Sequence, residues 1–323
     1  MRRVNISKEM TTRADSTPLP IVLGPTGSGK SELAIRIALA VGGEIVNCDS
    51  VQIYRRFDIG TAKVPETERR GVPHHLVDVI DPGELFTAGD YARRARRVLG
   101  EIAGRGRIPV VVGGTGFYLR ALLEGLVPGP ARDPAIRRRL EIRAENRPSS
   151  LHRLLTRLDP QAATQIHAND KSKIIRALEI RLLAGRPRSA LLEGGRDPLR
   201  GYHAIKIGLN PPRELLSKRL DERTGRMFER GLLDEVRNLL AGGVPPDARP
   251  FESLGYKQAL AVVEGRLAFD EALDRTRRET RQYAKRQMTW FRKEPGVHWL
   301  EGCGDDPDLQ FRAIEIVKKE SAL

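Results

Sequence analysis

One glycine-rich segment constrains the fold of this chain more than any other stretch: Gly24-Pro25-Thr26-Gly27-Ser28-Gly29-Lys30-Ser31. It matches the phosphate-loop pattern G-x-x-x-x-G-K-[ST] in full. A short apolar strand is predicted before it at residues 21–23, and apolar residues at helical spacing predict a helix after it at residues 32–40. A strand, a glycine loop and a helix in this order predict a P-loop within a parallel α/β sheet.

The P-loop indicates what kind of ligand the chain binds. Its glycines allow successive backbone N–H groups to curl around a phosphate, and the start of the following helix adds partial positive charge. Lys30 can reach the outer phosphate, and Ser31 can ligate Mg²⁺, which we expect as the cofactor. We therefore expect residues 24–31 to bind a diphosphate or a triphosphate. The pattern by itself does not specify ATP.

Apolar runs bounded by Gly, Pro or Asp predict further strands at residues 44–47, 76–80 and 108–112. A helix is predicted at residues 87–103, where Thr87 and Asp90 form a capping pair at its start. Strands that alternate with helices are typical of a parallel sheet with helices on its faces.

The pattern changes after Gly125, because Pro128-Gly129-Pro130 breaks the chain and no strand is predicted before residues 202–209. Helix starts are predicted at residues 133–134, 149–150, 160 and 170, each marked by a capping residue or an early proline. Residues 185–201 are interpreted as an exposed link. Long helices are predicted at 212–240, 253–264 and 269–293, then a strand at 297–300 and a final helix. We expect a disordered leader (1–18), a first part of the core (19–127), an all-helical insertion (128–201) and a second part of the core (202–323).

Composition narrows the partners and the compartment. The 323 residues carry a formal net charge of +14, which indicates a polyanionic partner, although a generally basic surface is an alternative. Cys48 and Cys303 are too few for a disulfide framework and have no zinc-ligand spacing. No segment is long and apolar enough to span a membrane, and the first eighteen residues lack the apolar run of a signal peptide. We expect a cytoplasmic protein with no membrane partner.

A carboxylate follows the second predicted strand. In a parallel sheet the carboxyl ends of the strands converge on the ligand, so Asp49 should point toward whatever the P-loop holds. This position makes Asp49 a candidate base. The alternative, of equal weight on position alone, is that Asp49 only caps a turn with Ser50.

An ATP-using enzyme remains an alternative at this point. An ordinary P-loop NTPase needs an acidic residue at the end of a neighbouring strand to orient Mg²⁺ and water. After residues 108–112 the chain instead has Gly113-Gly114-Thr115-Gly116. Asp78 or Asp81 could still serve.

Arginines after the returning strand are candidates for a second phosphate contact. Arg219 and Arg223 lie four residues apart, on one face of a predicted helix, and such a pair can grip a diphosphate. Nearby acidic residues allow the alternative of a solvated, ion-paired face.

The last long helix interleaves basic, amide and aromatic residues at positions 280–292, which suits a surface that follows an RNA backbone. The alternative is an ordinary amphipathic helix. We expect Tyr283, Met288 and Phe291 to face the core.

Several motifs occur together in one order and spacing: GPTGSGKS (24–31), DSVQIYRRFDIGTAK (49–63), PHHLVDVIDP (73–82), GGTGFYLRALLEG (113–125), HANDKSKIIRALEI (167–180), LGYKQ (254–258) and TRQYAKRQMTWFR (280–292). This set resembles the tRNA dimethylallyltransferases, also called tRNA isopentenyltransferases, over residues 19–300. The absence of an extension like the zinc finger of the eukaryotic relatives favours the bacterial type.

The resemblance implies transfer of a dimethylallyl group from its diphosphate to the exocyclic N6 of the adenosine immediately 3′ of the anticodon in tRNA. It implies that Asp49 takes the proton from the adenine amine, that Thr115 lies at the reacting centre, and that Lys30 and Arg223 hold the diphosphate. The positions that it assigns to tRNA contact are Asp49, Ser50, Val51, Gln52, Thr115, Arg137, Ser172, Lys173, Ile174, Ile175, Arg176, Glu252, Ser253, Leu254, Gly255, Tyr256, Lys257 and Arg281.

The resemblance also implies partners. The helical insertion resembles the part that clasps the anticodon stem-loop, and gripping one stem-loop suits a monomer. Three alternatives stay open: an enzyme that prenylates free adenine nucleotides, a kinase that uses ATP, and an RNA-binding protein without catalytic activity.

Overall fold

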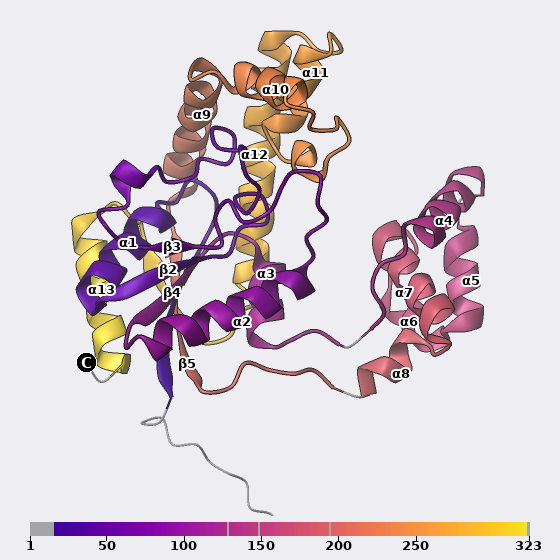
Figure 1. The fold of residues 1–323 in the computed structure, drawn as a ribbon, viewed down its shortest axis with the longest axis horizontal. Coiled ribbons are helices and arrows are strands. Elements are labelled where there is room, and N and C mark those ends of the chain that lie inside the picture. The colour runs from indigo at the N-terminus through magenta and orange to yellow at the C-terminus, as the bar shows by residue number, and fades with distance from the viewer. Residues whose placement is uncertain (1–15, 128, 148, 194, 322–323) are drawn as a thin grey trace, which may run out of the picture. The chain divides into compact units, whose positions relative to one another are not determined.

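The core of the protein is a parallel sheet of six strands in the order β3-β2-β4-β1-β5-β6. The computed structural model describes residues 16–127, 129–147, 149–193 and 195–321 (Figure 1). The strands are β1 (Thr17–Leu23), β2 (Gly43–Asn47), β3 (His74–His75), β4 (Ile108–Val112), β5 (Tyr202–Asn210) and β6 (Val297–Glu301). The helices are α1 (Lys30–Val41), η2 (Glu66–Glu68), α2 (Ala88–Gly104), α3 (Gly116–Leu123), α4 (Pro134–Asn146), α5 (Ser150–Leu158), α6 (Pro160–Gln165), α7 (Lys171–Ala184), α8 (Arg188–Glu193), α9 (Arg213–Glu229), α10 (Leu232–Ala241), η3 (Arg249–Glu252), α11 (Tyr256–Val263), α12 (Phe269–Phe291) and α13 (Pro307–Ser321). The predicted α/β class is confirmed.

Strand β1 is central and leads into the P-loop. It pairs with β5 along its whole length, whereas the pairing with β4 includes only Ile21 and Val22. Thr17 donates its N–H to Gly201 of the β5 side at 2.9 Å, so the alternate residues Pro18 and Pro20 turn their nitrogens toward β4. The missing N–H groups of these prolines therefore cost no bond to β5.

This strand corrects the predicted leader, which was placed at residues 1–18. Residues 1–15 lie outside the described residues, but Thr17 and Pro18 belong to β1 and pair with Tyr202 and His203. The strand prediction began at residue 21 because Pro18 and Pro20 interrupt the apolar run before it.

The strand predicted at residues 76–80 is wrong. Only His74 and His75 pair with β2, while Leu76 and Asp78 adopt left-handed backbone conformations with φ of 61° and 55°. The chain then bonds to a neighbouring loop, because Val79 donates its N–H to the Ile53 carbonyl at 2.8 Å. Leu76 and Ile80 are buried within that loop packing, which explains an apolar run without a strand.

Helices cover both faces of the sheet. Leu33 and Ile37 of α1 and Ala313 and Val317 of α13 join sheet residues such as Val110 in one buried cluster. Helix α2 packs against β2 and β4 on the other face (Figure 1). Its predicted start is confirmed, because Thr87 and Asp90 form a reciprocal capping box.

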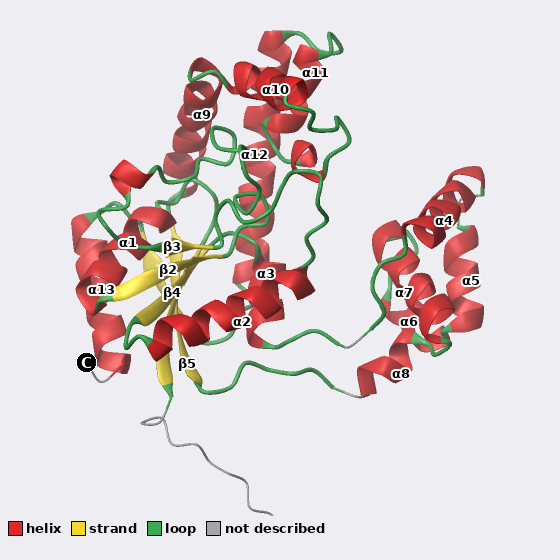
Figure 2. Cartoon of the chain, viewed as in Figure 1, coloured by secondary structure: helices red, strands yellow, loops and turns green. Residues whose placement is uncertain are grey.

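Residues Leu123–Pro198 form a separate compact unit. The unit contains α4–α8 and, in its described residues, no strand (Figure 2). Leu140, Leu155 and Leu178 lie in its own buried core. The predicted helix starts are confirmed at α4, α5, α6 and α7.

The link predicted at 185–201 contains the short helix α8, which the sequence did not indicate. Ser189 holds this helix against the start of α6, since its hydroxyl donates to the buried Asp159 carboxylate at 2.7 Å.

Helices α9–α12 gather beyond the carboxyl ends of the strands (Figure 1). The helix predicted at 212–240 is divided into α9 and α10 by Gly231, whose φ of 92° suits glycine. The helix predicted at 253–264 is η3 followed by α11. Across the described segments, no helix is both long and apolar enough to cross a membrane.

Candidate active site

The P-loop closes as the sequence pattern predicts, and its glycines are needed on steric grounds. Gly27 and Gly29 have φ of 78° and 83°. A Cβ atom on Gly27 would lie 2.7 Å from Leu220 of α9, and one on Gly29 would lie 2.8 Å from the Gly304 nitrogen. The loop is therefore held between α9 and the segment that follows β6.

Two neighbouring cavities meet beside this loop. The first, here the P-loop cavity, has a volume of about 380 Å³ and is lined by Thr26, Gly27, Gly29, Lys30 and Ser31 among others. Gly24, Pro25 and Ser28 are buried behind this wall. The second, here the α9–α12 cavity, also has about 380 Å³ and is lined by residues of both helices. The cavities share Thr26, Asp49, Thr61, Arg223 and Tyr283.

Asp49 fulfils both of the alternatives that the sequence left open. Its Oδ1 atom accepts hydrogen bonds from the N–H groups of Val51 at 2.8 Å and Gln52 at 3.3 Å, so it caps the turn after β2. Its side chain also lines both cavities. Among the described residues, both hydrogen bonds to this carboxylate use Oδ1, which leaves Oδ2 as the oxygen to accept a substrate proton.

Lys30 and Arg223 bring positive charge to the P-loop cavity. Lys30 Nζ donates to the Pro25 carbonyl at 2.7 Å, and Arg223 Nη1 donates to Thr26 Oγ1 at 3.3 Å. Burial, and then the charge of Arg223, lower the pKa of Lys30 to about 7, although Asp49 acts in the opposite direction. Burial also lowers the pKa of Arg223. Two half-buried basic side chains that line the same cavity favour an anionic ligand between them.

A pH dependence follows from Lys30. With a pKa of about 7 in the free protein, its amine is largely uncharged at about pH 8, and a bound polyanion favours the charged form. Binding of inorganic diphosphate is therefore expected to transfer up to about one proton to Lys30 at that pH, and almost none below about pH 6.

Calorimetric titrations in buffers of different ionisation enthalpy measure this proton uptake. Protonation of the diphosphate itself contributes equally to the titrations of wild type and Lys30→Met. Lys30→Met is therefore the matched control. Equal uptake by wild type and Lys30→Met at the higher pH would contradict this role of Lys30.

Gln287 of α12 ties the P-loop to the Gly-Gly-Thr turn. It accepts the Thr26 N–H at 2.8 Å and donates to the Gly114 carbonyl at 2.9 Å. Sequence reasoning missed Gln287. It also predicted that Tyr283 faces the core, whereas Tyr283 lies on the walls of both cavities. The four-residue spacing of Tyr283 and Gln287 was the available signal. Phe291 is buried as expected.

Thr115 lies one layer behind the cavity walls. Its Oγ1 accepts the Ser50 N–H at 3.1 Å, and its own N–H donates to the Cys48 carbonyl at 3.3 Å. Gly113 and Gly114 line the P-loop cavity. Thr115 therefore reaches the site by positioning Ser50, and direct contact with the reacting atoms stays a prediction.

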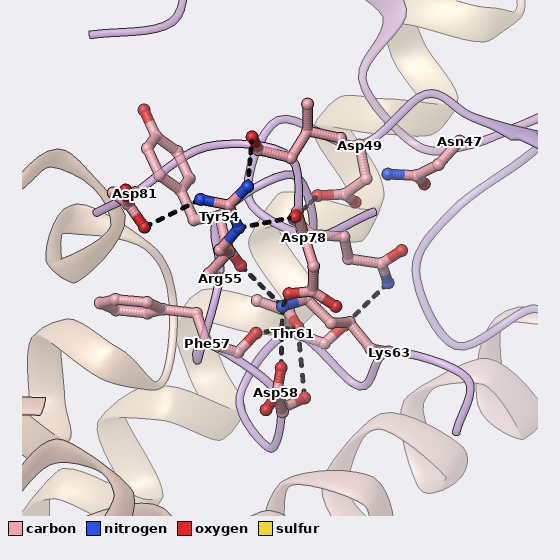
Figure 3. Close-up of polar contacts among 12 residues, drawn as sticks. Asn47, Asp49, Tyr54, Arg55, Phe57, Asp58, Thr61, Lys63, Asp78 and Asp81 are labelled. Atoms are coloured by element: carbon pink, nitrogen blue, oxygen red, sulfur yellow. Dashed lines mark hydrogen bonds and ion pairs between the residues drawn. The ribbon is translucent and has the colours of Figure 1, made fainter. Parts of the chain in front are cut away.

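Asp78 and Asp81, the acidic residues considered for an NTPase, form ion pairs away from the P-loop cavity. Lys63 Nζ contacts Asp78 at 2.5 Å and Asp58 at 2.8 Å, and Arg55 pairs with Asp81 at 3.1 Å (Figure 3). In the described part of the chain, Asp78 and Asp81 are not among the residues of the P-loop cavity. These pairs hold the loop after Asp49 in place.

Tyr256, one of the positions assigned to tRNA contact, has its side chain in the interior of the protein. It is fully buried and stacks at a tilt on Phe57 with ring centroids 4.7 Å apart. Its hydroxyl accepts the Gly60 N–H at 3.1 Å and donates to Glu235 Oε1, while Glu235 Oε2 accepts the Ile59 N–H at 2.9 Å. Tyr256 therefore fixes the loop that carries Thr61, and contact of this position with tRNA stays a prediction. Gly255 is buried beside it.

Removing this hydroxyl should weaken the fold. In Tyr256→Phe, the half-buried Gly60 N–H loses its acceptor and Glu235 loses a donor, so the free energy of unfolding should fall by about 1–3 kcal/mol. Denaturant unfolding followed by circular dichroism measures the change. Tyr202→Phe, at a partly exposed position of β5, should stay within about 0.5 kcal/mol of wild type. Equal stability of the two variants would refute the role given to Tyr256.

The other positions assigned to tRNA contact divide by location. Those in the sheet-bearing unit that line one of these two cavities are Ser50, Val51, Glu252, Ser253 and Leu254 in the α9–α12 cavity and Gln52 in the P-loop cavity. Lys257 is exposed, and Arg281 pairs with Asp221 of α9.

In the helical unit, Ser172 and Lys173 are exposed on α7. Ile174 and Ile175 have side chains buried in the core of that unit, and contact of these two positions with tRNA stays a prediction. The motif spacing did not reveal which residues face inward. Arg137 and Arg176 converge on the fully buried carboxylate of Glu179, at 3.4 Å and 2.7 Å.

The fold and site together define a P-loop α/β protein of the group-transfer type, in which a carboxylate faces both a phosphate cradle and an adjoining cavity. The family model described as IPP transferase matches residues 52–294, and the one described as isopentenyl transferase matches residues 18–79. The chain belongs to the IPP transferase family.

Relatives and solved structures agree with the resemblance seen in the motifs. The chain is 58% identical over 302 residues to a tRNA dimethylallyltransferase of Solibacter usitatus (strain Ellin6076), which covers 94% of this chain and 98% of that protein. It is 52% identical over 304 residues to one of Koribacter versatilis (strain Ellin345), covering 92% and 97%. The crystal structure of the tRNA isopentenylpyrophosphate transferase of Bacillus halodurans matches with a TM-score of 0.69 and 35% identity, covering 95% and 98% of the chains. A eukaryotic dimethylallyltransferase acting on tRNA matches with a TM-score of 0.76 and 30% identity, covering 88% and 74%.

Proposed function

We propose that the protein transfers a dimethylallyl group from dimethylallyl diphosphate to N6 of the adenosine 3′-adjacent to the anticodon in tRNA, and releases diphosphate. One observation carries the proposal: the Asp49 carboxylate lines both the cavity at the P-loop and the neighbouring cavity between α9 and α12. A donor in one cavity and an acceptor in the other would meet at this residue. The names of the relatives support the same reaction.

The donor's diphosphate fits the P-loop cavity. Residues 26, 27 and 29 of the loop, together with Lys30 and Arg223, line this space. When the bond between the allylic carbon and oxygen breaks, negative charge develops on the departing oxygen, and these groups stabilise it. These groups stabilise the transition state more than the ground state, because the departing oxygen carries more negative charge once its bond to carbon has begun to break.

The acceptor adenine fits the α9–α12 cavity. The walls include Ser50, Val51 and residues 252–254, from motifs that carry the family resemblance. As N6 forms its bond to the allylic carbon, Asp49 takes the proton from N6, which makes the delocalised amine a better nucleophile. A nucleobase must leave its stack to enter such a cavity, at a cost of a few kcal/mol.

Mg²⁺ is proposed as the cofactor, and the residues fit it. Ser31 lines the P-loop cavity and offers a hydroxyl oxygen. Among the described residues, no group of three or more His, Cys, Asp or Glu side chains could hold a metal by itself, which suits an ion bound mainly by substrate phosphates and water. When bound, Mg²⁺ neutralises part of the diphosphate charge.

The anticodon stem-loop of tRNA is the proposed macromolecular partner, and a monomer is the proposed functional form. The net charge of +14 supports a polyanionic partner. Exposed cationic side chains of the helical unit, such as Lys173, Arg138 and Arg139, can contact its phosphates.

The test is incubation with unmodified tRNA, dimethylallyl diphosphate and Mg²⁺, followed by mass analysis of the nucleosides. The expected product is N6-dimethylallyl adenosine at the position 3′ of the anticodon. Parallel reactions with AMP as acceptor and with γ-labelled ATP as donor separate the alternatives. Prenylated AMP without prenylated tRNA, or phosphate transfer without a prenyl product, would overturn the proposal.

A further inference from the structure

An ion pair bridges the two elements that hold the P-loop. Gly27 lies under Leu220 of α9, and Gly29 lies under Gly304 of the segment between β6 and α13. Arg219 of α9 donates to Asp305 of that segment through both terminal nitrogens, one of them at 2.8 Å. Both residues of the pair line the P-loop cavity, so the pair forms part of its rim.

The segment has hydrogen bonds of its own besides the ion pair. Gly304 donates its N–H to the Ser28 carbonyl at 2.8 Å, and Gln310 Nε2 donates to the Gly304 carbonyl at 2.8 Å. The Asp305 side chain is 46% exposed and that of Arg219 is 31% exposed, and ion pairs this open to water contribute little to stability. A role of the pair in ligand binding is therefore considered.

Arg219 is suited to bind phosphate. It lies one helical turn before Arg223, on the same face of α9, and Arg223 already contacts Thr26 of the P-loop. A guanidinium group binds phosphate oxygens in the same two-pronged manner as it binds a carboxylate. In the free protein, however, Asp305 occupies that fork.

We infer that Arg219 is a second guanidinium ligand of the diphosphate, and that Asp305 competes with the diphosphate for it. When diphosphate binds, Arg219 turns to it from Asp305; when diphosphate leaves, Asp305 takes the guanidinium back. The carboxylate thereby lowers the affinity of the site for diphosphate and promotes its release. This inference rests on the proposed function, because it assigns the diphosphate of that reaction to this cavity.

Calorimetric titration with inorganic diphosphate and Mg²⁺ tests the inference without any need for prenyl transfer. Asp305→Asn is expected to bind diphosphate about tenfold more tightly than wild type, the scale of one charge-assisted contact. Asp305→Ser should tighten binding similarly. Arg219→Gln is expected to bind more weakly than wild type. In the Arg219→Gln background, Asp305→Asn should change the affinity by less than about twofold.

A matched control separates this competition from a general charge effect. Asp308→Asn removes an exposed carboxylate from the start of α13 and should leave diphosphate affinity near that of wild type. The inference is overturned if Asp305→Asn binds diphosphate no more tightly than wild type, or if it tightens binding equally with and without Arg219.

The product-inhibition constant of diphosphate in the tRNA assay gives an independent measurement, and it should fall in Asp305→Asn. Absence of prenyl transfer by the wild type would refute the proposed reaction, and the calorimetric comparison would still decide the role of Asp305.

Discussion

Asp49→Asn is expected to slow prenyl transfer by about two to four orders of magnitude, the usual contribution of a positioned general base. The asparagine oxygen can still accept the Val51 and Gln52 N–H groups that Asp49 Oδ1 accepts in the wild type, so the turn should persist. Donor binding should change little. Single-turnover measurements with saturating tRNA and donor report the chemical step directly.

Asp49→Ala provides the comparison. This variant loses the turn cap as well as the base, so a difference between the two variants measures the structural contribution of the cap. An asparagine variant with the wild-type single-turnover rate would remove Asp49 from the chemistry.

Lys30→Met is expected to reduce turnover by about 10²–10³-fold, as the loss of one preorganised charge on a departing oxygen does. Donor affinity should also fall. The variant should remain as stable as the wild type, because methionine fills a similar volume and removes a buried amine whose pKa burial has already lowered. Steady-state assays over a range of donor concentrations, with thermal unfolding beside them, measure both effects.

The matched control for this variant is Lys318→Met, at an exposed position of α13. This substitution also replaces a lysine with methionine, but at a position that does not line the P-loop cavity. The variant should retain full activity. A Lys30→Met enzyme with unaltered kcat and donor KM would show that the P-loop does not hold the reacting diphosphate.

The parts of the fold that depend on local pattern were predictable from the sequence. The P-loop, the capping box at Thr87 and the helix starts at Asp133 and Asp170 rest on residues close together in the chain. The position of Asp49 beside the P-loop followed from the convergence of parallel strands at their carboxyl ends.

The parts that depend on distant partners were not predictable. Gln287 lies 261 residues from Thr26, and the bond between them exists only because α12 returns to the P-loop. Tyr256 belongs to a motif of the resemblance, but its burial follows from its packing on Phe57 and its bond to Glu235. The run at residues 76–80 is apolar because a loop buries it, and apolar character alone does not distinguish such a loop from a strand.

The most direct test of the central claim is a crystal structure with a non-hydrolysable thio-analogue of the donor and an anticodon stem-loop. The expected result has the diphosphate against residues 26–31, the target adenine in the α9–α12 cavity, and the Asp49 carboxylate about 2.6–3.2 Å from N6. A diphosphate bound away from the P-loop, or an adenine whose N6 is beyond the reach of Asp49, would contradict the account.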